Sequence, residues 1–364
     1  MAVTSEQAKA YLDSLAKPPG SLGLLEEWAA KLCVVQNTMR PQSGPMSTLV
    51  FCGDHGVKKE NAGISPFPPV ISQVVFRALA NGESATGTLS SAVGCHLTII
   101  DCGLDGDVSD VGKSTLPKHI SVVHKKVNAG TSNILTGPAM SSQQLLDAMA
   151  VGAKCVQDEN KKRGSLVIAV GEVGIGNTTV AAALLSAVTG SSAQDCCGRG
   201  TGLDEAGLAH KIATVKDACE QHIPNFSKIE DRPERAMEIL RSLGGFEIAA
   251  MVGAYIEANK SGILTVVDGF ISAVAALLAV QIQPLCSTNM VFATGLEEEP
   301  RAPVGGRILW EALGKPRSAL SMNLCLGETS AATLALPLIR AAARIVTSMG
   351  TLEQVQRLIL PTQE

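Results

Sequence analysis

Short apolar runs alternate along this chain with longer stretches in which apolar and small residues recur at helical spacing. The runs are short enough to be buried strands (about 4–8 residues), and they are rich in Val, Ile and Leu. They lie at 46–52, 95–101, 165–170, 262–267 and 289–293. The expected helices lie at 4–35 with a break at 17–23, 70–91, 141–160, 178–190, a stretch ending near 222, 244–259, 270–280 and 326–346.

This alternation predicts the class of fold. Strands separated by helices are typical of βαβ units, in which the sheet is mostly parallel and helices cover its faces. The segment 105–140 is expected to be irregular. The chain has 364 residues, which is enough for one large α/β domain or two modest ones.

A glycine-rich turn joins the strand at 165–170 to the helix that follows. Its three glycines are Gly171, Gly174 and Gly176. A strand that turns through glycines into a helix presents free backbone N–H groups at the positive end of the helix dipole, which is an anion site and most often a phosphate site. Asn177 or Thr178 can cap the helix and line the same site.

Asn177, which follows the last of these glycines, limits the kinds of phosphate that the turn is expected to bind. Residues 171–178 have the outline G-x-x-x-x-G-x-T of a P-loop, but Asn177 stands where a P-loop has lysine. Without that lysine, binding of ATP or GTP is disfavoured, and a monophosphate stays open. The alternative is that the glycines serve only a tight connection between strand and helix.

Acidic residues follow several of the predicted strands. They are Asp54, Asp101, Glu172 and Asp268, each near a glycine. In a parallel sheet, ligands bind beyond the carboxyl ends of the strands. A single acid there is usually a turn former, but four in the same topological position predict a shared acidic crevice lined by glycines.

Composition excludes several classes of protein. The net charge is −4, so a basic surface of the size that nucleic-acid binding needs is not expected. No apolar run reaches the roughly 18 residues of a membrane span, and the N-terminal segment lacks the apolar core of a signal peptide. A cytoplasmic protein that binds neither nucleic acid nor membranes is therefore expected.

The ten cysteines are expected to be structural. They include no C-x-x-C pair and no Cys/His spacing of a zinc site, so no metal site is predicted. Several lie in apolar strands, where a free cysteine behaves as a small hydrophobic residue. The neighbouring pair Cys196 and Cys197 is interpreted in the same way.

Seven sequence blocks, in order along nearly the whole chain, resemble one enzyme family. They are KPPGSLG at 17–23, GDHGV at 53–57, GEVGIGNTT at 171–179, GRGTGLDE at 198–205, GGFEIAA at 244–250, VDGFIS at 267–272 and LGETSAATLALPLI at 326–339. The family is nicotinate-nucleotide–dimethylbenzimidazole phosphoribosyltransferase. Seven ordered blocks are far more specific than any one glycine motif.

This resemblance implies both a fold and a reaction. It implies a Rossmann-like α/β domain at 41–310 and a small helical domain built from 1–40 and 311–364, in a homodimer without metal or cofactor. The implied reaction moves phosphoribose from nicotinate mononucleotide to 5,6-dimethylbenzimidazole or a related base. The products are α-ribazole 5′-phosphate and nicotinate.

The resemblance also implies roles for individual residues. The general base falls on Glu328, with Glu172 positioning or polarising the reacting groups and Lys211 as a cationic partner of the substrate. The phosphate is expected on the turn with Gly174, Gly176, Asn177 and Thr178, with Gly200, Thr201 and Gly202 nearby. The acceptor base is expected beside Ser65, Gln73 and Leu326.

The chain departs from the family pattern around the acceptor base. Thr329 and Ala331 replace glycines of the last block, the preceding loop lacks the usual histidines, and Phe67 and Pro69 stand where a tyrosine and a glutamate are usual. A nucleotide- or ribazole-binding protein without turnover is therefore the alternative function. A dehydrogenase is disfavoured, because the glycines run G-x-x-G-x-G and no acid follows about 20 residues later.

Overall fold

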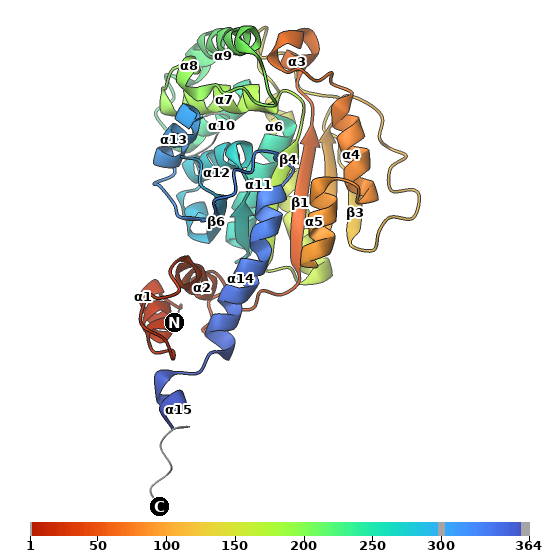
Figure 1. Cartoon of the computed structure of the whole chain (residues 1–364). Coiled ribbons are helices and arrows are strands. Elements are labelled where there is room, and N and C mark those ends of the chain that lie inside the picture. Colours follow the sequence, from red (N-terminus) through yellow and green to blue (C-terminus); the bar gives the residue numbers. More distant parts are fainter. Residues whose placement is uncertain (1, 298–302, 358–364) are drawn as a thin grey trace, which may run out of the picture.

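The computed structural model describes residues 2–297 and 303–357, and it has a central sheet with helices on both faces (Figure 1). Seven strands, all parallel, lie in the order β3-β2-β1-β4-β5-β6-β7. Their bounds are β1 Met46–Gly53, β2 His96–Gly103, β3 Ile120–His124, β4 Val167–Val173, β5 Leu264–Val267, β6 Met290–Thr294 and β7 Ser318–Leu320. The expected α/β fold with a parallel sheet is confirmed.

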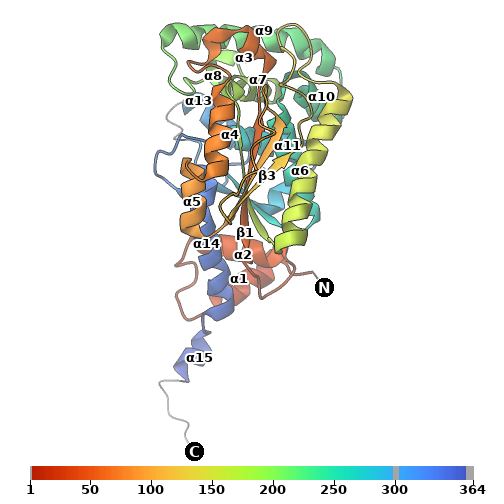
Figure 2. The same cartoon turned by 90° about the vertical axis from the view of Figure 1, so that its right-hand side faces the viewer.

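The helices form layers around this sheet. Helices α6, α11 and α12 cover one face, and α4, α5 and α14 cover the other (Figure 2). The helix bounds are α1 Ser5–Asp13, α2 Leu24–Val35, α3 Gly56–Glu60, α4 Ile71–Asn81, α5 Ala85–Val93, α6 Ser142–Arg163, α7 Asn177–Thr189, α8 Ala193–Cys196, α9 Glu205–Phe226, α10 Arg232–Leu243, α11 Phe246–Lys260, α12 Phe270–Ile282, α13 Pro303–Ala312, α14 Ser330–Ser348 and α15 Leu352–Gln356. Two short 3₁₀ helices lie at 62–64 and 284–289.

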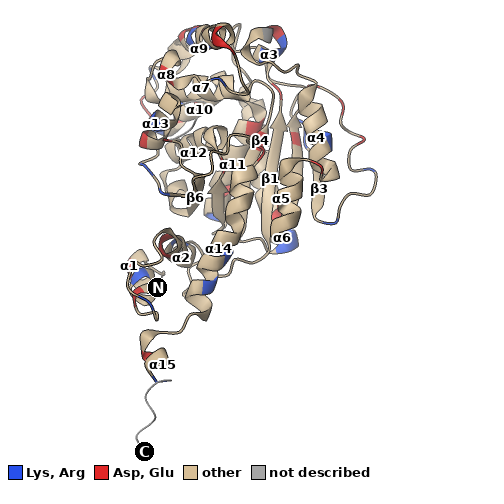
Figure 3. Cartoon of the chain, in the orientation of Figure 1, with Lys and Arg blue, Asp and Glu red and all other residues tan. Residues whose placement is uncertain are grey.

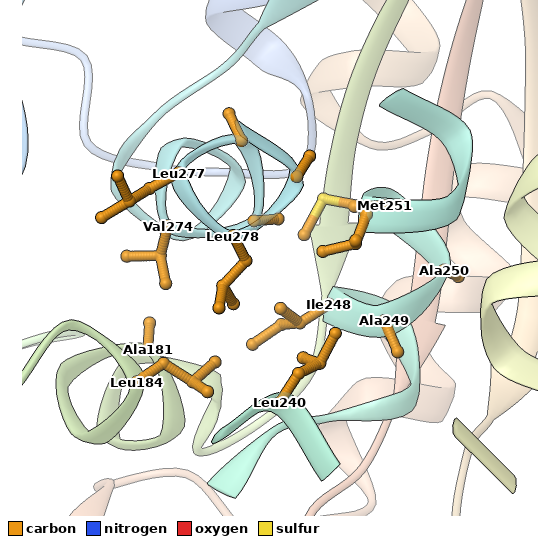
Figure 4. Close-up of a cluster of buried hydrophobic side chains, with 14 of the residues drawn as sticks. Ala181, Leu184, Leu240, Ile248, Ala249, Ala250, Met251, Val274, Leu277 and Leu278 are labelled. Carbon is orange, nitrogen blue, oxygen red and sulfur yellow. The ribbon is translucent and has the colours of Figure 1, made fainter. Parts of the chain in front are cut away.

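Strand β4 is apolar along its length because both of its faces are covered. Ile168 and Val170 belong to the core under α11 and α12, whereas Val167 and Ala169 belong to the core under α14. The first core continues outward between α7, α10, α11 and α12 through aliphatic side chains and Met251 (Figure 4). A parallel strand buried on both sides reads as a continuous apolar run, which is why the sequence pattern identified it.

The strand order places a crevice beside β1. From β1 the chain builds β2 and β3 on one side, and then crosses back to place β4 and the later strands on the other. Such a reversal opens a crevice at the carboxyl ends of the two central strands. In Figure 3, acidic residues lie inside the fold at this end of β4.

Four local predictions need correction. The expected helix at 70–91 is two helices, because Gly82 is left-handed (φ 78°) and ends α4, and Ser84 then caps α5. The segment 105–140 contains β3, a half-buried edge strand, and α10 has no counterpart among the expected helices. The last long helix begins at Ser330 and not at 326.

The segment after α1 and the segment before α15 meet below the sheet (Figure 1). Leu15 and Thr351 form a short antiparallel bridge, and the hydroxyl of Tyr11 donates to the carbonyl of Val346. Helix α14 packs against α2 and also against β4, β5 and β6. The division into domains at 1–40, 41–310 and 311–364 stays a prediction.

Helix α14 is the one helix in the described ranges that is long and apolar enough to cross a membrane by length and composition. Its most apolar window is 56% buried within the protein. It also carries Arg340 and Arg344. Packing against the sheet and α2 therefore accounts for its apolar character.

Candidate active site

Four carboxyl groups converge at the carboxyl ends of the central strands. Glu172 lies near the end of β4, Asp268 follows β5, Glu247 lies in the first turn of α11, and Glu328 precedes α14. Glu172 and Asp268 are each 4% exposed and Glu247 is fully buried, while Glu328 is half-buried. The sheet and two helix starts thus bring together acids from four separate segments.

The two oxygens of the Glu172 carboxyl face different segments. The side-chain amide of Asn177 donates to Oε2. A Cβ atom at Gly327 would lie 3.4 Å from Oε1, so this oxygen faces the segment that carries Glu328. Burial, and then the charges of Glu247, Asp268 and Glu328, raise the pKa of Glu172 well above 4.5.

Glu328 lies in a left-handed backbone segment held from three sides. Gly327, Glu328 and Thr329 have φ values of 83°, 59° and 64°. The Thr86 hydroxyl donates to the Glu328 carbonyl at 2.6 Å, and the Thr329 hydroxyl donates to the Leu49 carbonyl at 3.2 Å.

The third support of this segment comes from Asp268. Its Oδ1 accepts the Ala332 N–H at 2.8 Å, so it holds the first turn of α14. Burial raises the pKa of Asp268 to about 7, although hydrogen bonds from the backbone of α14 act against this rise. Non-glycine residues rarely adopt positive φ unless the surroundings impose it, and here three separate contacts do so.

The side chain of Glu328 has an unused acceptor. Its Oε2 is buried and has no hydrogen-bond partner among residues 2–297 and 303–357. Burial raises the pKa of Glu328 above 4.5. A half-buried carboxylate with a free oxygen and a raised pKa is suited to accept a proton from a bound ligand.

The β4–α7 turn presents backbone N–H groups as expected, but without the expected side-chain cap. Gly176 is the N-cap of α7 with φ 99°, and no side chain hydrogen-bonds to the first N–H groups of the helix. Asn177 instead donates to Glu172, and the Thr178 hydroxyl accepts from Lys211. The N–H groups of Asn177 and Thr179 donate to the carbonyls of Gly174 and Gly176, whereas the Thr178 N–H has no acceptor among the described residues and can serve an anion.

Lys211 joins this turn to the loop at 198–202. Its Nζ donates to Thr178 Oγ1 at 2.9 Å and to the Gly198 carbonyl at 3.1 Å. A Cβ atom at Gly200 would lie 3.0 Å from Thr178 Oγ1, while Thr201 and Gly202 are exposed at the rim. Burial lowers the pKa of Lys211 to about 8.

The residues expected to bind the acceptor base are more dispersed. The Ser65 carbonyl accepts from Lys58 Nζ at 2.9 Å, which places it near the β4–α7 turn. The Gln73 amide donates to the Asp105 carbonyl at 3.3 Å, and Leu326 is 56% exposed. The base-binding role of these three residues stays a prediction.

Ser72, the neighbour of Gln73, makes the more central contacts. Its hydroxyl donates to Asp54 Oδ1, and it accepts the Ile175 N–H at 3.1 Å. The other carboxyl oxygen of Asp54 accepts the Asp105 N–H at 2.8 Å. Asp54 and Ser72 therefore tie the end of β1 to the start of α4 and to the β4–α7 turn.

A buried ion pair lies behind these groups. His55 Nε2 is 3.1 Å from Glu247 Oε1, and both side chains are fully buried. Burial lowers the pKa of His55, but the charges of Glu247 and Asp54 outweigh it and raise the value above 6.5. Within the described ranges, no group of three or more His, Cys, Asp or Glu side chains is arranged to hold a metal.

Comparison with known proteins identifies the family. A family model described as "Phosphoribosyltransferase" matches residues 2–356. The chain is 39% identical over 349 residues to nicotinate-nucleotide–dimethylbenzimidazole phosphoribosyltransferase of Desulforamulus reducens, covering 95% of this chain and 92% of the relative. It is 40% identical over 337 residues to the protein of the same name from Azotobacter vinelandii, covering 93% of this chain and 89% of the relative. The chain belongs to the nicotinate-nucleotide–dimethylbenzimidazole phosphoribosyltransferase family.

Solved structures agree with this assignment. The crystal structure of CobT from Thermus thermophilus matches with a TM-score of 0.84 at 32% identity, over 97% of this chain and 98% of the other. A second crystal structure from the same organism, whose title names the same phosphoribosyltransferase, matches with a TM-score of 0.83. The chain is thus an enzyme of the phosphoribosyltransferase class, as the sequence blocks predicted.

Sequence analysis did not find every residue that shapes the site of this phosphoribosyltransferase. It named the blocks GDHGV and GGFEIAA but gave no role to His55 or Glu247, which those blocks contain. The glycines beside both residues were a usable signal. Asp101, expected in the shared crevice, forms an ion pair with Lys126 and accepts the Leu104 N–H.

Proposed function

We propose that this enzyme transfers the 5-phosphoribosyl group of nicotinate mononucleotide to 5,6-dimethylbenzimidazole or a closely related base. A ring nitrogen of the base forms a bond to ribose C1′ while the bond from C1′ to the pyridinium nitrogen breaks. The electron pair of that bond stays with the leaving nitrogen and yields nicotinate. Attack opposite the leaving group converts the β linkage into the α linkage of α-ribazole 5′-phosphate.

The base must lose its ring proton, and we assign Glu328 to accept it. The unpartnered Oε2 of Glu328 is the observation that carries the proposal, because it is a buried acceptor with no other use within the described ranges. Gly327, the neighbour of Glu328 in the chain, lies against the Glu172 carboxyl, and the charge of Glu328 helps to raise the pKa of Glu172 at the end of the sheet where ligands bind in this fold. General-base assistance of this kind contributes about 10²–10⁴-fold to a rate.

The phosphate is proposed to bind at the start of α7. The turn of Gly174, Gly176, Asn177 and Thr178 would hold it, with the Asn177 N–H already donating to the Gly174 carbonyl, and Lys211 brings a positive charge to the same turn. The 198–202 loop, with Gly200, Thr201 and Gly202, would close the other side. This arrangement supports a monophosphate and provides no lysine at the P-loop position.

The acceptor base is proposed to lie between Glu328 and the 65–73 segment. Ser65 and Gln73 would line that side, and Leu326 would cover the other. From its resemblance to the family, the enzyme is expected to act as a homodimer in the cytoplasm.

The decisive experiment compares Glu328→Gln with the parent enzyme. We expect release of nicotinate that requires added dimethylbenzimidazole and that falls by about 100-fold or more in Glu328→Gln, with binding of the mononucleotide retained. The control is Glu311→Gln, which changes a solvent-exposed carboxyl paired with Lys315. Its activity should match that of the parent.

Three other outcomes would contradict the proposal in distinguishable ways. Nicotinate release without any added base would indicate a hydrolase. Tight binding of the mononucleotide with no product by mass spectrometry would indicate a binding protein without turnover. Full activity in a folded Glu328→Gln would leave phosphoribosyl transfer in place but remove Glu328 as its base.

A further inference from the structure

The buried pair His55 and Glu247 has no part in the reaction as proposed above. His55 follows β1 and Glu247 begins α11, so the fold brings them together from distant parts of the sequence. His55 Nε2 and Glu247 Oε1 lie 3.1 Å apart, but neither these two atoms nor His55 Nδ1 and Glu247 Oε2 make a hydrogen bond of normal geometry in the part of the chain that the structure describes. Burying a carboxylate is costly unless a positive charge accompanies it. The pair therefore needs a reason beyond packing.

Three motif glycines make room for this pair. A Cβ atom at Gly53 or Gly245 would lie 2.8 or 2.5 Å from Glu247 Oε2, and a Cβ atom at Gly174 would lie 3.2 Å from His55 Nε2. Each distance is shorter than an ordinary van der Waals contact. The end of β1, the start of α11 and the β4–α7 turn thus close tightly around the pair, two residues from Glu172.

Ionisable and polar groups surround Glu172 and the His55–Glu247 pair on all sides. Glu172 is faced by Glu247 of α11, Asp268 after β5, Glu328 before α14, the Asn177 amide of α7 and the Cys52 thiol of β1. The pair itself is faced by Asp54 and by the Cys102 thiol of β2. Burial and the charges of neighbouring acids raise the pKa of Glu172, and burial also raises those of Asp268 and Glu328, so this arrangement favours retention of a proton among them.

Burial sets Glu328 apart from the other three acids, and the backbone N–H groups of α14 favour the ionised form of Asp268. Glu172 is almost fully buried and lies among three other acids, whereas Glu328 is half-buried at the edge of the cluster. Glu247 lies 3.1 Å from His55, whose pKa is raised above 6.5 by the nearby charges of Glu247 and Asp54 against the effect of burial. The charged neighbour that most disfavours ionisation of Glu172 is Glu247.

We propose that the His55–Glu247 pair determines which carboxyl group of the site is protonated. Ionised Glu247 keeps Glu172 as a neutral carboxylic acid, and Glu328 is left as the ionised carboxylate. Their different surroundings give the two carboxyl groups different proton affinities and therefore different tasks. Glu172 serves as a hydrogen-bond donor, and Glu328 serves as a base. His55 and Glu247 are positioning residues in this scheme, and only the task of Glu328 rests on the proposed function.

Infrared spectroscopy of the substrate-free enzyme tests the proton assignment without any assay of turnover. The C=O stretching band of a protonated carboxyl is followed against pH and assigned to Glu172 by its loss in Glu172→Gln. We expect the band in the parent enzyme at neutral pH. In Glu247→Gln its midpoint should move to lower pH by about one unit or more, because removing a negative neighbour lowers the pKa of an acid.

A double-mutant cycle gives a second readout. His55 is the side chain that Glu247 contacts in this pair, so His55→Gln should shift the Glu172 band in the same direction as Glu247→Gln. The double variant should then show no further shift, since the two residues act as one unit. Additive shifts would contradict the pairing.

The matched control is Glu159→Gln. Glu159 is also a buried carboxyl, but it accepts from Ser47 and Thr98 at the other end of β1 and β2. This variant should lose stability and leave the Glu172 midpoint unchanged. The proposal is overturned if the parent enzyme shows no protonated Glu172 at neutral pH, or if folded Glu247→Gln keeps the parent midpoint. Nicotinate release, measured separately on the same samples, reports on the proposed function alone.

Discussion

Lys211 shows how burial tunes a single residue at this site. It is 1% exposed, and its amino group donates to the Thr178 hydroxyl and the Gly198 carbonyl and to no carboxylate of the described residues. Burial lowers its pKa to about 8, so the amino group is mostly charged at neutral pH and mostly neutral above about pH 9. A lysine held in this way can respond to a bound phosphate by becoming fully charged.

We therefore predict that binding of nicotinate mononucleotide weakens as the pH rises through about 8. The phosphate itself stays doubly ionised over this range, since its second pKa is about 6. Lys211→Met should weaken binding by about tenfold or more, because a hydrogen bond to a charged group contributes about 1.5–3 kcal/mol. Calorimetric titration at several pH values between about 7 and about 9 measures both effects.

The control for this prediction lies on the same helix. Lys216 is exposed on α9 and paired with Glu220, so Lys216→Met should bind like the parent at every pH. If Lys211→Met kept the pH dependence of the parent, another group would have to be responsible for it.

At the scale of elements, the contact between β4 and the start of α14 places Glu328 against the sheet. Gly171 has no side chain, and Thr329 occupies the space beside it: a Cβ atom at Gly171 would lie 2.9 Å from both Cα and Cβ of Thr329. Thr329 is β-branched, yet it adopts φ 64°, a conformation that costs such residues about 1–2 kcal/mol. Its hydrogen bond to Leu49 and its tight packing on β4 offset this strain.

Gly171→Ala should push the 327–329 segment away from β4 and reduce kcat by displacing the Glu328 carboxylate. A displacement of about 1 Å in a catalytic group can cost about 100-fold. Thr329→Gly should restore part of that loss in the double variant, because it removes the Cβ and hydroxyl that the alanine meets. Steady-state kinetics of the two single variants and the double variant measure the rescue.

A glycine in another part of the chain provides the control for Gly171→Ala. Gly137 has open space where a Cβ would be, so Gly137→Ala should leave kcat unchanged. A double variant no better than Gly171→Ala would mean that Thr329 does not transmit the effect.

The strands that could be predicted from the sequence are those buried on both faces. Strands such as β1 and β4 are buried on both faces, so tertiary packing reinforces their local pattern. The edge strand β3 escaped notice because its five residues are mostly half-buried. The boundary between α4 and α5 was missed although Gly82 and Ser84 are typical stop and start residues, because the apolar pattern continues across them.

The same reasoning explains which parts of the site could be predicted. Glu172 and the glycine turn are close in sequence, the last family block contains Glu328, and Lys211 is the lysine that shortly follows the block at 198–205. The contact between His55 and Glu247 depends on how β1 and α11 pack in three dimensions, which local patterns do not encode. The left-handed backbone at Thr329 was equally hidden, since threonine is a residue that rarely adopts it.

For the whole molecule, the cluster of buried acids should make stability depend on pH in an unusual direction. Asp54, Glu172, Asp268 and Glu328 all have raised pKa values, with burial as the first cause, and that of Asp268 rises from 3.8 to about 7. An acid with a raised pKa binds its proton more tightly in the folded state, so its contribution is present below the unfolded pKa and is lost as pH rises through the folded one. His55, raised above 6.5, acts in the same direction.

Surface carboxyl groups have the opposite effect on the free energy of unfolding, but they exert it at lower pH. Asp110 beside Arg77 and Asp158 beside Lys154 have lowered pKa values, so their stabilisation is lost only as pH falls below about 3.8. The free energy of unfolding is therefore expected to be greatest near pH 5 and to decrease toward about pH 7.

We predict that Tm, measured by calorimetry, falls by a few degrees between about pH 5 and about pH 7.5. One unit of pKa shift corresponds to about 1.4 kcal/mol, and 1 kcal/mol to roughly 2–4 °C in domains of about 150–250 residues and less in a longer chain. Glu172→Gln removes one of the acids responsible and should flatten this slope, whereas Glu311→Gln at the surface should keep it. A Tm that rises over the same range would show that the site acids are ionised at little cost, and the proton assignment among them would then have to be revised.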